Sequence, residues 1–231
     1  MAHESVDLVL CDLPFGMTQA GWDKPINLGA LWWAYSKVLK PTSNVVLFGV
    51  QPFSSALVQS APHLFRYSLV WAKNKSRGHL NAKKRPMAAH EDILIFGRPG
   101  AYYRPVMSGG HVPQHEAMNE RRSLRGERAL YGAVKQHRSR AGATDRYPTT
   151  VLSFPVVNND DPERIHPTQK PIALLEHLIE LYCPPGGWVL DNAMGSGSSI
   201  VAANNLGRHA IGIELAEDFF AKAEARITSR S

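Results

Sequence analysis

The feature that most constrains the fold is a short apolar segment, Val6–Cys11, that ends in the acidic turn Asp12-Leu13-Pro14-Phe15-Gly16. The segment is rich in aliphatic residues and predicts a buried β-strand. The turn then places a carboxylate and an aromatic ring at the carboxyl end of that strand, where open α/β sheets bind their ligands. Pro14 has no N–H and a fixed φ, so the carbonyls beside it stay free to accept from a ligand. The turn also has a purely local interpretation, because Asp and Pro favour turns for their own conformational reasons.

Acids also end two strands that are predicted near the other end of the chain. These strands are Trp188–Leu190, which ends in Asp191, and His209–Ile213, which ends in Glu214. A loop with Gly195 and Gly197 follows the first of them and leads into a predicted helix, and such glycines let the backbone approach a ligand closely. Ile200 stands where the third glycine of Gly-x-Gly-x-x-Gly would be, so the loop disfavours a pyrophosphate cofactor.

Three motifs in this order resemble those of the DNA amino-methyltransferases with the permuted, or β-class, arrangement. The opening turn at Asp12 is similar to their Asp-Pro-Pro-Tyr/Phe motif, with Leu13 in place of the first proline. The loop Asp191–Gly197, followed by Glu214, resembles the S-adenosylmethionine site of Rossmann-like methyltransferases. The segment His166–Pro171 matches a further signature of the class. The resemblance covers nearly the whole chain and implies an α/β fold: a Rossmann-like methyltransferase sheet with helices on both faces, a circularly permuted motif order and a large basic insertion.

The resemblance assigns residues to two parts of one site. The catalytic turn that receives a flipped base comprises Asp12, Leu13, Pro14 and Phe15. The residues expected to bind S-adenosylmethionine are Asp12, Phe48, Lys170, Asp191, Ala193, Met194, Gly195, Ser196, Gly197, Glu214 and Leu215. Each assignment has a structural alternative: a helix start for the segment around Lys170, and a solvated acid at a strand end for Glu214.

The chemistry that this turn suits is transfer of a methyl group to an exocyclic amino nitrogen. Such a nitrogen is a poor nucleophile because its lone pair conjugates with the base. A carboxylate on Asp12 and a carbonyl of Leu13 or Pro14 would accept its two N–H groups, while Phe15 stacks on the flipped base. We expect adenine N6 as the target. The alternatives are cytosine N4, for which the turn more often begins with Ser, an NAD-dependent oxidoreductase, and a catalytically inactive DNA-binding module.

Charge is concentrated in one segment of the chain. Residues 73–146 hold 16 Lys and Arg against 6 Asp and Glu, whereas the rest holds 10 against 14. A basic segment on an acidic scaffold indicates a polyanionic partner, here double-stranded DNA. The residues expected to contact DNA are Lys73, Lys75, Lys83, Lys84, Arg85, Arg121, Arg122, Arg125 and Arg128.

Domain organisation follows from the same pattern. Residues 1–97 alternate predicted strands and helices and form the catalytic half of one α/β domain, and residues 162–231 form its cofactor-binding half. Residues 98–161 have poor periodicity and much Gly, Arg, His and Pro. A segment this long is either a target-recognition region or a solvated insertion. Enzymes that this chain resembles begin with a further strand and helix, whereas only Met1–Ser5 precede the first predicted strand here. An edge strand and any adenine contact from it are expected to be missing, and either the start is truncated or the sheet is shorter.

Composition excludes several other classes. The chain has no run of about 18 apolar residues and no basic-then-apolar start, so we expect a cytoplasmic protein without a membrane span. Its two cysteines make no disulfide framework, and Cys183 precedes prolines rather than following one, which disfavours cytosine-C5 chemistry. His111 and His115 lack further ligands, so no metal site is expected. A homodimer is possible, and the sequence identifies neither a recognition sequence nor a restriction partner.

Overall fold

The computed structural model describes residues 2–16, 21, 23–113 and 142–230 of the chain. The chain divides into two compact units, Met1–Arg104 with Thr150–Ser231, and Pro105–Thr149. In chain order the elements of the first unit are β1 (Val6–Cys11), α1 (Leu28–Val38), β2 (Leu39–Gly49), α2 (Phe53–Ser60), β3 (Phe65–Arg77), the short 3-10 helix η1 (His79–Asn81), β4 (Ala88–Gly97), β5 (Val151–Ser153), α5 (Ile172–Tyr182), β6 (Trp188–Asp191), α6 (Ser198–Asn205), β7 (His209–Gly212) and α7 (Glu217–Thr228).

A seven-stranded sheet forms the centre of the first unit, in the order β5-β3-β4-β2-β1-β6-β7. Strand β1 pairs in parallel with β2 and β6, and β7 pairs in parallel with β6. Strand β4 runs antiparallel to both β2 and β3. From β1 the chain passes to β2 on one side and later enters β6 on the other, so the carboxyl end of β1 is a topological switch point, where such sheets bind ligands.

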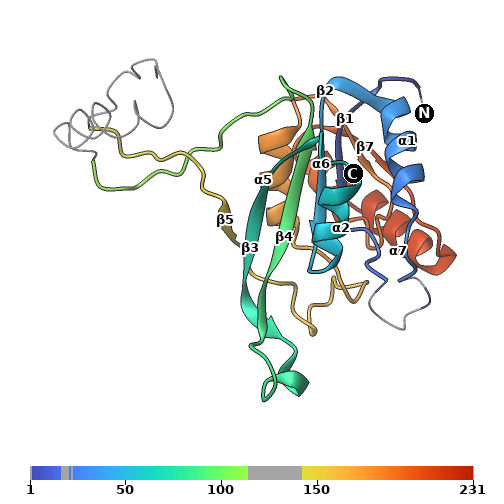
Figure 1. The fold of residues 1–231 in the computed structure, drawn as a ribbon, viewed down its shortest axis with the longest axis vertical. Coiled ribbons are helices and arrows are strands. Elements are labelled where there is room, and N and C mark those ends of the chain that lie inside the picture. The colour runs from blue at the N-terminus through green and yellow to red at the C-terminus, as the bar shows by residue number, and fades with distance from the viewer. Residues whose placement is uncertain (1, 17–20, 22, 114–141, 231) are drawn as a thin grey trace. The chain divides into compact units, whose positions relative to one another are not determined.

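Helices cover both faces of this sheet (Figure 1). All six residues of β1 are buried, and alternate ones point to opposite faces. Val9 and Cys11 belong to a core cluster with Leu31 of α1 and Leu57 of α2. Helix α5 packs against β1 and α6 on the opposite face, and Figure 1 shows α5 and α1 on opposite sides of the strands. The expected α/β sheet with helices on both faces is thereby confirmed.

Two helices differ from the sequence-based prediction, one in where it ends and one in how much of its apolar face is buried. The helical pattern predicts that α1 continues to Pro41, but α1 ends at Val38 and Pro41 lies in β2. Pro41 is in the exposed first part of that strand, where a missing N–H is tolerated. In α7 the spacing of Phe219, Phe220, Ala223 and Ile227 predicts one buried apolar face, but only part of it is buried: Ala223 is fully buried, whereas Phe220 is 40 % exposed.

Strand β5 lies within residues 98–161, for which the sequence predicts no regular element. Val151 pairs with Val70 of β3, so this part of the segment belongs to the sheet. Three residues are too few to show a period, so no sequence pattern predicts this strand. Of the second unit the structure describes residues 105–113 and 142–149, in which Ser108 and Arg146 form an antiparallel bridge. No described helix is long and apolar enough to cross a bilayer.

Candidate active site

The acids that follow or end three strands lie together at the carboxyl ends of those strands. Asp12 follows β1, Asp191 ends β6 and Glu214 follows β7, and these three strands are parallel neighbours. A cavity of about 670 Å³ lies there, and Phe48 of β2 and Lys170, just before α5, also line it. Segments from opposite ends of the chain therefore build one pocket.

The cavity brings together nearly all residues that the sequence assigns to the catalytic turn and the cofactor. Those that line it are Asp12, Leu13, Pro14, Phe15, Phe48, Lys170, Asp191, Ala193, Met194, Gly195, Ser196, Glu214 and Leu215. Gly197 is the exception: its left-handed φ of +68° and its position against α7 make it a packing residue, since a Cβ there would lie 3.1 Å from Ile227. The chemical roles of the lining residues stay predictions.

Among the described residues, one oxygen of the Asp12 carboxylate accepts a hydrogen bond and the other does not. Oδ2 accepts a hydrogen bond from the ammonium of Lys170. Oδ1 is buried and has no hydrogen-bond partner in the part of the chain that the structure describes. Burial raises the pKa of Asp12 above its ordinary value, although the charge of Lys170 opposes that shift. An unsatisfied buried acceptor is costly, so it marks a position where a ligand donor would be stabilised.

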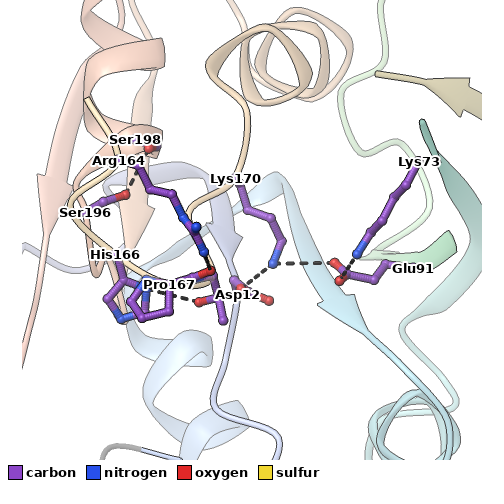
Figure 2. Close-up of polar contacts among 10 residues, drawn as sticks. Asp12, Lys73, Glu91, Arg164, His166, Pro167, Lys170, Ser196 and Ser198 are labelled. Atoms are coloured by element: carbon purple, nitrogen blue, oxygen red, sulfur yellow. Dashed lines mark hydrogen bonds and ion pairs between the residues drawn. The ribbon is translucent and has the colours of Figure 1, made fainter. Parts of the chain in front are cut away.

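Lys170 belongs to a buried chain of alternating charges that the sequence did not reveal (Figure 2). Its ammonium lies 3.5 Å from Glu91 Oε2 and 4.9 Å from the centre of the Phe48 ring. Lys73 in turn donates to Glu91 Oε1. Burial works against the Lys170 ammonium, but Asp12 and Glu91 outweigh it and raise its pKa. The one sequence signal is that Glu91 stands, with Asp92, directly before the apolar run Ile93–Phe96 of a strand.

Local contacts fix the turn that follows β1. Leu13 is 2 % exposed and belongs to the core, so it anchors the turn between Asp12 and the aromatic residue. The Gly16 N–H donates to Asp23 Oδ1 at 2.7 Å and closes the loop. The Phe15 ring lies 5.1 Å from the ring of Phe53 in α2. The ring that we expect to stack on a base is thus held from one side by the scaffold.

The loop after β6 is held by its own acid. Asp191 Oδ1 accepts from the Ala193 N–H at 3.1 Å, and Oδ2 accepts from the hydroxyl of Ser199 in α6. Burial raises the pKa of Asp191 to about 6, against those hydrogen bonds. Tyr35 of α1 also donates to Asn192 Oδ1 at 2.6 Å, so the loop is tied to helices on both faces of the sheet.

Glu214 is oriented by backbone groups. Its two oxygens accept from the N–H groups of Gly195 and Ala216, each at 2.9 Å. Each carboxylate oxygen has a second lone pair, so acceptor capacity remains for hydroxyl donors in the cavity. Arg226 of α7 steadies the same loop by donating to the Ser196 carbonyl at 3.1 Å.

The segment His166–Pro171 forms another wall of the cavity. The His166 ring lies 4.4 Å from the ring of Phe219 in a nearly perpendicular arrangement, and both residues line the cavity. Thr168 contacts His166 Nδ1 through its hydroxyl at 3.0 Å. Burial lowers the pKa of His166, which favours the neutral imidazole.

The basic residues predicted to contact DNA fall into three groups. Lys75, Lys83, Lys84 and Arg85 are exposed and lie at the end of the β3–β4 hairpin. Lys73 differs from that expectation, because its side chain is 4 % exposed and is paired with Glu91. Charge counting does not show which lysine of a strand is buried against an acid of the neighbouring strand, as Lys73 is against Glu91 of β4. The third group, Arg121, Arg122, Arg125 and Arg128, lies outside the described residues.

Two further classes of site receive no support among the described residues. Cys11 and Cys183 are both buried, and burial raises the pKa of Cys183 to about 12, so its thiol stays protonated at neutral pH. In the described part of the chain no three His, Cys, Asp or Glu side chains are grouped as metal ligands would be. The acid-lined cavity is therefore the candidate site that the following comparisons concern.

Comparison with known proteins agrees with this geometry. Over its whole length (99 %) the chain is 24 % identical to the type II methyltransferase M.HpaI of Haemophilus parainfluenzae, of which the match covers 70 %. A 66-residue stretch is 46 % identical to the putative methylase YubD of Escherichia coli K12 and covers 29 % of each protein.

Solved structures share the fold. The crystal structure of M1.HpyAVI in complex with SAM superposes with a TM-score of 0.64 at 23 % identity, covering 96 % of this chain and 89 % of that one. The cytosine-N4-specific PvuII DNA methyltransferase also gives 0.64, at 14 % identity, covering 99 % and 85 %. Residues 6–225 match the N6_N4_Mtase family, described as DNA methylase, and the chain is a member of that family.

Proposed function

We propose that this protein is an S-adenosylmethionine-dependent DNA methyltransferase that acts on adenine N6. The observation that carries the proposal is the Asp12 carboxylate, which lines the cavity at the switch point of the sheet and keeps one oxygen without a partner among the described residues. The family accounts for methylation of an amino group on DNA. The choice of adenine rests on the acid at the head of the turn, where enzymes of the cytosine-N4 type more often have Ser.

The polar and apolar groups that line the cavity fit S-adenosylmethionine. The lone pairs left on Glu214 suit two ribose hydroxyls, and the loop Asp191–Ser196 offers backbone groups beside them. The apolar side chains of Met194, Leu215 and Phe219 provide a surface for a purine ring. When bound, S-adenosylmethionine supplies an electrophilic methyl group, which leaves its sulfur for the amino nitrogen of the base.

The residues of the turn would make that nitrogen reactive. Asp12 accepts one amino N–H and a carbonyl of Leu13 or Pro14 accepts the other, which favours a tetrahedral nitrogen with its lone pair directed away from the ring. Phe15 stacks on the base and holds it in register. Asp12 also receives the proton that the nitrogen loses once it is alkylated. No covalent bond to the protein is needed, so the rate depends on positioning and electrostatics.

Double-stranded DNA is the proposed substrate, and the end of the β3–β4 hairpin is a proposed contact with its backbone. Four basic residues are exposed there: Lys75 near the end of β3, and the consecutive residues Lys83, Lys84 and Arg85 just before β4. Lysines and arginines bind phosphates regardless of sequence, so this surface would contribute affinity rather than recognition. The arginines of residues 121–128 stay a sequence-based prediction for the same role.

The test uses unmethylated genomic DNA, isotopically labelled S-adenosylmethionine and the purified protein, with Asp12→Ala as the matched control. Mass spectrometry of the digested nucleosides should show labelled N6-methyladenine, absent with the control. Labelled N4-methylcytosine would instead overturn the assignment of the base and leave the family chemistry intact. Calorimetry should show binding of S-adenosylhomocysteine and none of NAD. Binding of NAD without methylation would favour the oxidoreductase alternative.

A further inference from the structure

A line of four charged side chains, three of them buried and Asp12 partly buried, runs through the sheet behind the catalytic turn. Lys73 of β3 pairs with Glu91 of β4, Glu91 with Lys170, and Lys170 with Asp12 (Figure 2). The side chains of Lys73, Glu91 and Lys170 are 4 %, 11 % and 9 % exposed. Buried ions are costly unless each is paired, so this line is either a purely structural network or one kept for its effect on Asp12.

The order of the charges favours an effect on Asp12. Lys170 lies between two carboxylates, so the position of its ammonium depends on both. Glu91 attracts that ammonium from the side away from Asp12 (Figure 2), and of the two Asp12 oxygens in the described structure the ammonium donates to Oδ2 and not to Oδ1. Without Glu91 the ammonium would have one carboxylate to bind and would be free to move over both of its oxygens.

We propose that Glu91 is a positioning residue for Asp12: from two strands away it holds Lys170 on one oxygen of the Asp12 carboxylate, so that the other keeps its full capacity to accept from the amino group of the base. Its negative charge also partly cancels that of Lys170, so Asp12 stays a useful proton acceptor. Lys73 offsets the charge of Glu91, which makes the four groups neutral together. The inference rests on the proposed function only in taking the amino group of a DNA base as the donor to Asp12.

Two effects of opposite sign follow for the ionisation of Asp12. Lys170 stabilises the Asp12 carboxylate, whereas Glu91 destabilises it. The other groups around Asp12 are Lys73, Asp191 at the end of β6 and the protonated thiol of Cys11, and they stay the same in every variant below. Removing Glu91's charge should therefore lower the pKa of Asp12, and removing Lys170's charge should raise it.

The test measures this pKa directly. Carbon-13 NMR of protein labelled at aspartate side chains follows the Asp12 carboxyl, assigned by its disappearance in Asp12→Asn. Glu91→Gln should move the midpoint down and Lys170→Met should move it up, each by about one pH unit or more, the size typical of one charge within 4–6 Å. Glu224→Gln and Lys37→Met, which remove single exposed charges elsewhere, should leave it unchanged.

Kinetics provides a second measurement. Glu91→Gln should lower kcat roughly 10- to 100-fold, with much smaller changes in KM for DNA and cofactor, because a misplaced acceptor affects the reaction more than binding. The acid limb of its pH–rate profile should move to lower pH, and that of Lys170→Met to higher pH. If Glu91 and Lys170 only supported the fold, their variants would lose thermal stability. The acid limbs of the two pH–rate profiles would then not move in opposite directions.

The outcomes separate this inference from the proposed function. If the Asp12 midpoints move as expected but the wild-type protein methylates no DNA, the proposed function fails and the role of Glu91 toward Asp12 stands. If DNA is methylated and Glu91→Gln leaves the midpoint in place or raises it, the inference is wrong. Should Lys170→Met fail to fold, the shift in Glu91→Gln still decides, because that variant keeps side-chain volume.

Discussion

Replacing Asp12 separates the catalytic role of the turn from its structural role. In Asp12→Asn the side chain keeps its shape but becomes a neutral, weaker acceptor. In Asp12→Ala the acceptor is gone, and a buried lysine is deprived of its main partner. The proposed function predicts that methyl transfer falls in both variants, and the structure predicts that stability falls as well.

The size of the stability loss follows from what remains around Lys170. A hydrogen bond to a charged group contributes about 1.5–3 kcal/mol. Full isolation of a buried charge would cost more, about 3–5 kcal/mol, but Lys170 keeps Glu91 at 3.5 Å and the Phe48 ring at 4.9 Å. We therefore expect the free energy of unfolding to fall by about 1.5 kcal/mol in Asp12→Asn and by about 3 kcal/mol in Asp12→Ala. For a chain of this size this lowers Tm by about 3–12 °C.

The rate loss should be larger than the stability loss can explain. Removing one acceptor aimed at the reacting centre costs on the order of 10²–10³ in rate. Single-turnover methylation at room temperature, far below either Tm, measures the rate, and a DNA-binding titration checks that the substrate still binds. A wild-type rate in Asp12→Asn would falsify the catalytic assignment. Unfolding of both variants at room temperature would show that Asp12 is a structural residue of the turn.

Three further predictions concern other parts of the site. Gly197→Ala should destabilise the protein by about 1–2 kcal/mol in urea denaturation, because φ is +68° there and a Cβ would press on α7. Burial raises the pKa of Asp191 from 3.8 to about 6, so this carboxyl loses its proton at a lower pH in the unfolded chain than in the folded protein. Its contribution to the free energy of unfolding is therefore fully present below about pH 4 and is lost as the pH rises to 6. In pH-dependent denaturation the wild type should lose about 3 kcal/mol over that window relative to Asp191→Asn. Replacing Lys83, Lys84 and Arg85 by Ala should weaken DNA binding and reduce the slope of log K against log salt by about 0.9 for each phosphate that the variant no longer neutralises, and an unchanged slope would show that the hairpin does not touch DNA.

The parts of the site that the sequence predicts are those with a local signature. A buried strand followed by a turn is readable at Val6–Gly16 because the apolar run and the proline are adjacent. The loop after β6 is readable for the same reason. Asn27 is a further local signal, because Asn is favoured at N-caps and here accepts from the Ala30 N–H at 3.0 Å directly before α1. Parallel neighbours share a carboxyl edge, so local signatures at three strand ends were enough to place one cavity.

The parts that the sequence missed depend on pairing between distant strands. Glu91 and Lys170 are far apart in the chain, and their contact exists only because β4 lies beside β2 in the sheet. Strand β5 is recognised only through its pairing with β3. The spacing of Phe220 predicts that it lies on the buried face of α7, but the underlying surface there is too small to cover it. Periodicity indicates the face of a helix and not the extent of what it packs on.

Lys73 shows how the buried network changes the interpretation of charge along the chain. It contributes to the excess of positive charge in residues 73–146, and on that count alone it belongs to a DNA-binding surface. Its burial beside Glu91 removes it from that surface, whereas Lys75, two residues on in the same strand, is exposed. We therefore propose two roles for the described part of the basic segment. Its exposed residues at the end of the β3–β4 hairpin would meet phosphates, and its buried lysine would neutralise the acid that positions Lys170 against Asp12. Lys73→Met should consequently lower the rate of methyl transfer while leaving the salt dependence of DNA binding unchanged, which is the opposite of the result expected for the exposed lysines. If Lys73→Met and the variant of Lys83, Lys84 and Arg85 both reduced the salt dependence of DNA binding to the same extent, the assignment of separate roles to buried and exposed lysines would be wrong.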